Sequence, residues 1–247
     1  MKTVINRYLR RMGVELHGTG YLQALAKGEF KKDAFAMQRE LTKPRPVRTI
    51  FDVGANRGDI SHLYHDVFPE AEIHAFEPFP QTYGVLEENF SGATFMHCVP
   101  KALSNTEGVR QLYVNKNVDT NSLLKPTRMG LSSDSQVENL SRIDIQTTTL
   151  DIYCAQNGIE RIDILKMDVQ GGELDILKGA QRLLEQNKIG LIYTETYFLE
   201  QYEGHPLFHE ISGLLHKYGF YLQDIYSPIY GKGCLAWADV IFVKRDH

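Results

Sequence analysis

Acidic residues recur where apolar segments of the chain stop, and their positions suggest one shared polar cleft. Asp52, Glu77, Asp168 and Glu195 each stand at the carboxyl end of a segment with the composition of a buried strand. Ionised carboxylates are rarely buried without partners. Because ligands of open parallel sheets bind beyond the carboxyl ends of the strands, we expect these four side chains to meet at one binding edge.

A glycine-containing turn, Gly54–Gly58, follows Asp52 directly and has Asn56 at its centre. Its spacing is GxxxG, whereas dinucleotide-binding turns use GxGxxG to bring backbone N–H groups to a pyrophosphate. An acid beside the turn disfavours a diphosphate and suits the α-ammonium group of S-adenosylmethionine, which carries no phosphate. Glu77, followed by Pro78, suits a bidentate hydrogen bond to ribose hydroxyls. The turn therefore predicts an S-adenosylmethionine site, with an ordinary tight connection as the alternative.

The same edge offers groups that could remove a proton from a methyl acceptor. Methyl transfer is an in-line displacement at a sulfonium-activated carbon, so a hydroxyl acceptor must be positioned and deprotonated. Candidate bases are Asp168, Glu195 and His205, which precedes Pro206 at the start of an expected helix. Lys166 shares a strand face with Asp168, so it either tunes a catalytic carboxylate or forms a structural ion pair. A divalent metal held by Asp168 and Glu195 stays open.

The elements that position these residues alternate between strand and helix. This alternation predicts an α/β fold with a doubly wound parallel sheet, closed by two strands that have no helix between them and so form an antiparallel element. Pro206 is expected in the first turn of its helix. Strands are predicted at 49–54, 72–78, 93–99, 109–114, 142–150, 162–169, 189–196, 220–226 and 235–244, and helices at 59–68, 80–90, 171–186 and 205–219.

Charge divides the chain into a basic beginning and an acidic remainder. Residues 1–48 contain 11 Lys and Arg against 4 Asp and Glu, and the remainder contains 16 against 27. We predict a helical arm at 1–46, linked through Lys43–Pro46 to a domain at 47–247. The arm packs on the domain, covers the cleft, joins a homodimer or meets a membrane surface. An acidic body argues against nucleic acid as a partner.

Cysteine usage and hydropathy indicate a cytoplasmic protein. Cys98, Cys154 and Cys234 are far apart and form no CxxC motif, so we expect reduced thiols rather than disulfides or a zinc site. The beginning of the sequence lacks the apolar stretch of a signal peptide, and no run approaches the roughly 18 apolar residues of a membrane span.

Two further segments have compositions that suit the walls of a substrate site. The polar insert at 115–141 is long for a plain connection and is predicted to form a lid or substrate rim, in which Asn121 and Ser122 would contact ligand. The segment Tyr197–His209 is rich in aromatic residues and histidine, and it is predicted to form the opposite wall or simply part of the core.

Several motifs, in this order and spacing, resemble the FkbM family of S-adenosylmethionine-dependent methyltransferases. The resemblance covers about Thr49 to Lys244 and leaves the first forty residues outside. It implies the class I methyltransferase fold, a Rossmann-like, doubly wound, seven-stranded sheet that is mostly parallel with an antiparallel last strand. The motifs are FDVGANRGDIS, HAFEPFP, KALSNTEG, TTLDIY and DILKMDVQGGELDILKGA.

The resemblance also implies roles for individual residues. Carried over by position, Asp52, Gly54, Asn56 and Gly58 would line the methionine part of the cofactor, and Glu77 would hold the ribose. Adenine would lie against Lys101–Ser104, including Ala102 and Ser104. The family usually has an acid where this chain has Gln170, whereas Glu173 is retained.

The sequence as a whole predicts an enzyme that methylates a small molecule. The main hypothesis is an S-adenosylmethionine-dependent O-methyltransferase acting on a hydroxyl of a sugar or secondary-metabolite acceptor, with S-adenosylhomocysteine as product. Alternatives are N-methylation of a small molecule, an NAD-dependent oxidoreductase, and a catalytically silent binding module that keeps the fold.

Overall fold

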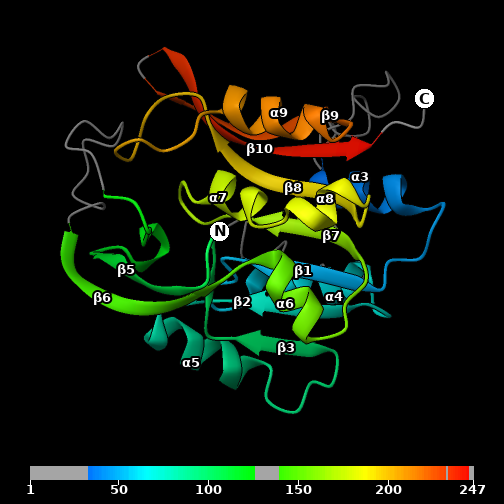
Figure 1. Ribbon diagram of the computed structural model, residues 1–247, viewed down its shortest axis with the longest axis horizontal. Coiled ribbons are helices and arrows are strands. Elements are labelled where there is room, and N and C mark those ends of the chain that lie inside the picture. The colour runs from blue at the N-terminus through cyan, green and yellow to red at the C-terminus, as the bar shows by residue number, and fades with distance from the viewer. Residues whose placement is uncertain (1–32, 126–138, 232, 245–247) are drawn as a thin grey trace, which may run out of the picture. The chain divides into compact units, whose positions relative to one another are not determined.

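The computed structural model describes residues 33–125, 139–231 and 233–244 (Figure 1). The chain divides into the units Met1–Glu40 and Leu41–His247. Helix α3 (Ala34–Thr42) begins after Asp33, whose carboxylate accepts hydrogen bonds from the N–H groups of Phe35 and Ala36. Most of the predicted arm at 1–46 lies outside the described residues, so the arm, its boundary and a homodimer through it stay predictions.

A seven-stranded sheet forms the centre of the unit Leu41–His247, in the order β3-β2-β1-β7-β8-β10-β9 (Figure 1). β10 runs antiparallel to both of its neighbours, and the other pairings are parallel. This confirms the predicted doubly wound sheet with an antiparallel last strand. The strands are β1 (Thr49–Val53), β2 (Glu72–Phe76), β3 (Met96–Val99), β7 (Ile162–Met167), β8 (Ile189–Tyr197), β9 (Phe220–Gly231) and β10 (Cys234–Lys244).

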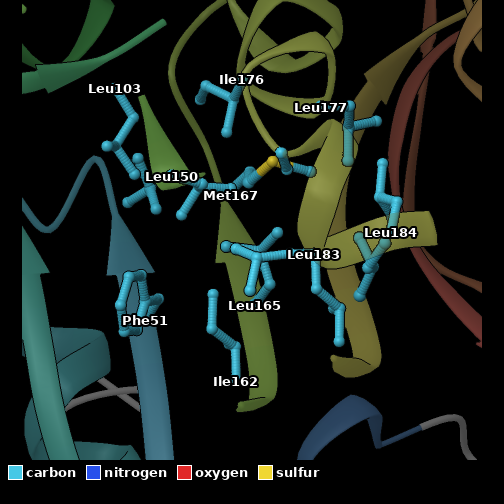
Figure 2. Close-up of a cluster of buried hydrophobic side chains, with 14 of the residues drawn as sticks. Phe51, Leu103, Leu150, Ile162, Leu165, Met167, Ile176, Leu177, Leu183 and Leu184 are labelled. Atoms are coloured by element: carbon cyan, nitrogen blue, oxygen red, sulfur yellow. The ribbon is translucent and has the colours of Figure 1, made fainter. Parts of the chain in front are cut away.

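Helices cover both faces of this sheet because neighbouring strand residues point to opposite sides. One face packs against α6 (Leu150–Gln156), α7 (Glu173–Lys178), α8 (Gln181–Glu185) and α9 (Phe208–Lys217). The other face packs against α4 (Asp59–Val67) and α5 (Pro80–Asn89). Figure 2 shows the first interface, where side chains of β1 and β7 meet those of the helices, among them Phe51, Leu150, Leu165, Met167, Ile176, Leu177, Leu183 and Leu184.

A second, three-stranded sheet stands apart from the first in hydrogen bonding, in the order β4-β6-β5. It contains β4 (Ala102–Leu103), β5 (Gly108–Asn115) and β6 (Asn139–Thr148), and a short helix, η1 (Val118–Thr120), follows β5. β5 and β6 were predicted as added strands. Residues 126–138 of the predicted lid lie outside the described part of the chain.

One predicted helix, over 171–186, is in fact two, and Gly179 is the reason for the break. α7 and α8 are separated by Gly179 and Ala180. A Cβ at position 179 would lie 2.2 Å from the backbone oxygen of Ser104. The new helix begins where the Asp151 carboxylate accepts the N–H groups of Arg182 and Leu183, at 2.8 and 3.1 Å. Close packing on a neighbouring loop, which a helical sequence pattern does not reveal, therefore ends α7.

The start of α9 also differs from the prediction. The helix begins at Phe208 with Leu207 as its N-cap, so Pro206 precedes the cap rather than lying in the first turn. Glu210 accepts the backbone N–H of Leu207 at 2.9 Å and closes the first turn.

Gly179→Ala is expected to destabilise the protein by about 1–3 kcal/mol, the typical cost of overpacking. The added methyl group would meet a backbone oxygen that cannot move without disturbing β4. Gly213→Ala in α9 is the matched control, because nothing lies within 4 Å of its added Cβ. Alanine there should stabilise the helix by about 0.5–1 kcal/mol. Urea unfolding of both variants measures the difference, and equal effects would contradict the packing argument.

The cysteines and the hydropathy of the helices can be compared with the sequence predictions. All three cysteines are free, as predicted. Within the described residues, no helix is both long enough and apolar enough to cross a bilayer. The cytoplasmic location stays a prediction.

Candidate active site

A cavity of about 400 Å³ opens at the carboxyl ends of β1, β2 and β7, the edge where the sequence placed the site. This volume falls within the range of small-molecule sites, about 300–1,000 Å³. Of the predicted site residues, Asp52, Gly58, Ser104, Glu195 and His205 lie outside its lining. Those in the lining are Gly54, Asn56, Glu77, Pro78, Ala102, Lys166 and Asp168, together with Asn121 and Ser122 of the insert.

The glycine turn after β1 owes its shape to backbone conformations that favour glycine. Gly54, Asn56 and Gly58 all have positive φ, at 74°, 52° and 90°. A Cβ at Gly54 would lie 1.9 Å from the backbone oxygen of Asp168. A Cβ at Gly58 would lie 2.3 Å from the Phe90 ring. The two glycines thus let the turn approach β7 and α5 closely, and only Gly54 borders the cavity.

Glu77 joins this turn to the end of β2. Its Oε2 accepts the backbone N–H of Asn56 at 3.0 Å, and its Oε1 accepts that of Phe79 at 2.9 Å. Burial raises the pKa of the Glu77 carboxyl, although these two hydrogen bonds oppose the shift. Each carboxylate oxygen keeps a lone pair. A buried acceptor pair at the cavity wall is therefore free to bind a vicinal diol.

Lys166 and Asp52 form a buried ion pair across β1 and β7. Their Nζ and Oδ1 atoms are 2.8 Å apart, and the Ser61 hydroxyl donates to the other Asp52 oxygen at 2.6 Å. Burial acts to lower the Lys166 pKa, but the negative charges of Asp52, Asp168 and Asp239 together outweigh it, so that the pKa is raised. The same Nζ donates to the Gly54 carbonyl at 2.9 Å. Asp52 thus acts on the turn through Lys166, and its carboxylate is fully buried outside the cavity lining.

Asp168 and Glu195 lie on either side of the Gln170 amide. Gln170 Nε2 donates to Asp168 Oδ1 and to Glu195 Oε2, both at 3.0 Å. Burial, followed by the charge of Asp168, raises the Glu195 pKa well above its ordinary value. The two predicted carboxylates therefore lie close together, and of the two only Asp168 lines the cavity.

The space between Asp168 and Glu195, where the sequence leaves a divalent metal open, contains the Gln170 amide. The amide N–H groups of Gln170 occupy the position between Asp168 and Glu195 that a bridging cation would need. In the described part of the chain, one group of potential ligands lies within 4.8 Å, and it contains Glu72, His74 and His97, none of which was predicted for the site.

His205 lies behind the cavity wall with a defined tautomer. Its Nδ1 accepts the backbone N–H groups of Gln201 and Tyr202, at 3.3 and 3.0 Å. The proton of the neutral ring is therefore on Nε2. Burial lowers the His205 pKa. With one nitrogen occupied and the other protonated, this histidine is arranged as a donor and not as the predicted base.

Two polar contacts join the insert to the cavity, and a third hydrogen bond lies within the insert. Asn56 Nδ2 donates to Asp119 Oδ1 at 2.8 Å, which connects the glycine turn to η1. The Ser122 hydroxyl donates to the Gln170 carbonyl at 2.7 Å, and Asn121 Oδ1 accepts the N–H of Asn115 at 2.8 Å. Asn121 and Ser122 lie at the cavity, as the rim prediction expects, whereas no sequence pattern pointed to Asp119.

Gln170 is the site residue whose role the sequence did not reveal. In the sequence it stands out only as an amide where the family usually has an acid, yet its side chain contacts both Asp168 and Glu195. A usable signal was a long side chain directly before two glycines, at a turn where glycine would suffice.

Glu173, at the start of α7, is fully buried, and burial raises its pKa to about 7 from 4.5. The folded protein therefore keeps a proton that the unfolded chain releases between about pH 4.5 and 7. This proton should make the free energy of unfolding fall by about 3 kcal/mol as the pH rises from about 4.5 to 7, and its contribution should not change at higher pH. Glu173→Gln should remove this fall, whereas Glu160→Gln, at an exposed position, should not. Urea unfolding at pH 4.5 and pH 8 compares them; parallel profiles for wild type and Glu173→Gln would contradict the assignment.

Comparisons with known proteins agree with this geometry. The family model described as the methyltransferase FkbM domain matches residues 52–222. The chain is 30% identical over 189 residues to the 2-O-methyltransferase NoeI of Sinorhizobium fredii (strain NBRC 101917 / NGR234), covering 74% of this chain and 76% of the relative. It is 25% identical over 207 residues to the 31-O-demethyl-FK506 methyltransferase FkbM of Streptomyces tacrolimicus, covering 75% and 77%.

Among solved structures, the chain is similar to the precorrin-6y C5,15-methyltransferase of Geobacter metallireducens GS-15, at a TM-score of 0.46 and 12% identity, covering 85% of this chain and 87% of that one. The sequence match spans the glycine turn, Glu77, Asp168 and Glu195, and it confirms the resemblance found in the sequence. The chain belongs to the FkbM family of S-adenosylmethionine-dependent methyltransferases.

Proposed function

We propose that the protein transfers a methyl group from S-adenosylmethionine to a hydroxyl of a small sugar or secondary-metabolite acceptor. The observation that carries this proposal is Asp168, a carboxylate on the cavity wall beside the glycine turn, held by Gln170. The names of two relatives support an oxygen acceptor, since one is a 2-O-methyltransferase and the other acts on 31-O-demethyl-FK506.

The cavity walls suggest how the cofactor is held. Glu77 would bind the ribose diol through the free lone pairs of its carboxylate, and the wall at Lys101–Leu103 would contact adenine. Gly54–Asn56 would hold the methionine part, and Lys166 fixes the Gly54 carbonyl there. When bound, the cofactor supplies an electrophilic methyl group on its sulfonium.

The chain's own contribution to chemistry is positioning and proton removal. Asp168 accepts the hydroxyl proton of the acceptor as the oxygen attacks, so that an alkoxide need not form free in solution. Glu195 and Lys166 act through Asp168 and the turn. An amine acceptor needs less help from a base, so N-methylation would depend weakly on Asp168.

Two measurements test the function. Calorimetry should show S-adenosylhomocysteine binding that is weakened at least tenfold by Glu77→Ala, which removes the diol acceptor and leaves two backbone N–H groups unpaired. A radiolabelled methyl-transfer screen over glycosides, hydroxylated natural products and matched amines then identifies the acceptor. Binding of NAD without binding of S-adenosylhomocysteine, or transfer confined to amines, would overturn the proposal.

A further inference from the structure

The Gln170 side chain uses every hydrogen-bonding position that an amide offers. Nε2 donates its two protons to Asp168 and Glu195. Oε1 lies 3.0 Å from the Tyr197 hydroxyl and 2.9 Å from the Tyr202 hydroxyl. An amide has two donors and two acceptor lone pairs, so all four are occupied by protein groups. Such saturation of one half-buried amide indicates a built network rather than an incidental contact.

The backbone of Gln170 shows that its side chain is the reason for its presence. Its φ is +56°, a left-handed conformation that is unfavourable for residues with a Cβ. Gly171 and Gly172 follow at once, so the turn already contains residues that adopt such conformations freely. The Ser122 hydroxyl further holds the Gln170 carbonyl at 2.7 Å. A strained residue kept in place by its neighbours is a frequent feature of functional sites.

Counting protons assigns a charge state to the two carboxylates. The Tyr197 hydroxyl lies 2.5 Å from Glu195 Oε2 and 3.0 Å from Gln170 Oε1, yet it has a single proton. If Glu195 were ionised, only one of these contacts could be a hydrogen bond. If Glu195 carries a proton, it donates to Tyr197, Tyr197 donates to Gln170, and Gln170 donates to Asp168. The chain of donors then ends at an ionised Asp168, while the second Nε2 proton of Gln170 returns to Glu195.

We propose that Gln170 is a positioning residue that keeps Asp168 as the ionised proton acceptor, holds Glu195 as its neutral partner, and takes the place of a bridging cation. The inference rests on the proposed role of Asp168 in methyl transfer. Without the amide, two carboxylates would face each other across the gap that Nε2 now fills. The methyl-transfer site is therefore independent of a divalent metal.

Three further charged groups surround the pair. Lys166 faces Asp168 from the same strand, Glu173 approaches from α7, and Asp239 approaches from β10, where the Tyr193 hydroxyl donates to it at 3.0 Å. The two acids add to the repulsion that a charged Glu195 would meet. Lys166 is already paired with Asp52.

Infrared difference spectroscopy tests the proton assignment without an acceptor substrate. At pH 7, wild type minus Glu195→Gln should show the carbonyl stretch of a protonated carboxylic acid, and wild type minus Asp168→Asn should not. In Gln170→Met, the carboxylate stretch of Asp168, identified by its loss in Asp168→Asn, should shift in frequency, because the amide donor to its Oδ1 is lost while the shape is kept. Gln181→Met, at an exposed position on α8, is the control and should leave that stretch unchanged.

The same variants separate failure of this inference from failure of the proposed function. Absence of S-adenosylhomocysteine binding by wild type would count against the function. Wild type that binds it, but shows an ionised Glu195 at pH 7 or an Asp168 carboxylate stretch that does not shift in Gln170→Met, would overturn the role of Gln170. If Gln170→Met does not fold, the same infrared measurement on Gln170→Asn replaces it, because the shorter amide side chain cannot reach both carboxylates.

A manganese titration tests the replacement of the cation. Wild type should bind no Mn²⁺ at this site in calorimetry, whereas Gln170→Glu should gain binding, because three carboxylates would then converge without a donor between them. Asp168→Asn in the Gln170→Glu background should remove the gained site. Mn²⁺ binding by wild type that disappears in Asp168→Asn would contradict the proposal.

Discussion

Asp168→Asn is expected to lower kcat for methyl transfer to a hydroxyl by about 10²- to 10⁴-fold, the usual contribution of a positioned base. The asparagine keeps the shape of the side chain and loses the acceptor for the hydroxyl proton. Binding of S-adenosylhomocysteine should stay within about threefold of wild type, because Asp168 adds no needed contact to the product cofactor. Initial-rate kinetics with the acceptor from the screen measure kcat, and calorimetry measures binding.

Asp66→Asn is the matched control for this experiment. Asp66 is an exposed carboxylate on α4, away from the cavity lining, so its replacement should change neither kcat nor binding. A loss of cofactor binding that parallels the loss of kcat in Asp168→Asn would show that Asp168 holds the cofactor and does not act as the base.

Lys166→Met is expected to destabilise the protein by about 3–5 kcal/mol, because it leaves the Asp52 carboxylate buried without its partner. It should also weaken S-adenosylhomocysteine binding at least tenfold, since the Gly54 carbonyl loses the ammonium group that fixes the turn. Urea unfolding and calorimetry measure the two effects separately. Lys217→Met, at an exposed position in the last turn of α9, should produce neither effect.

A double variant separates charge balance from the shape of the turn. Asp52→Asn combined with Lys166→Met buries no unpaired charge, so most of the lost stability should return. Cofactor binding should stay weak, because nothing replaces the bond to Gly54. Full recovery of binding in the double variant would show that the ion pair serves stability alone.

The sequence predicted the edge of the sheet at which the site lies, because parallel strands with short connections bring their carboxyl ends to one edge. The positions of Glu77 and Asp168 followed from that rule. The pairing of Asp52 with Lys166 did not, since it depends on the register in which Asp52 lies opposite Lys166 across β1 and β7. That register is a tertiary property, so the sequence left Asp52 as a ligand for a cofactor cation and Lys166 with an open partner.

Other differences have equally local causes. Gly179 ends α7 because of a loop that is distant in sequence, and a helical pattern contains no information about that contact. His205 suited a base by residue type, but two backbone N–H groups decide which ring nitrogen carries the proton. Gln170 was passed over because an amide has no charge, and its importance lies in which groups it separates.

The place of β10 between β8 and β9 has a consequence for the protein during its synthesis. β9 is synthesised directly after β8 and before β10, yet in the sheet it pairs with β10 and not with β8. Until residues 234–244 leave the ribosome, β8 has an open edge and β9 has no partner in the sheet. The carboxyl-edge site can form beforehand from β1, β2 and β7, but a ribosome-bound chain stopped at Gly231 would expose two unpaired strands. Such a nascent chain should depend on chaperones far more than one that includes β10.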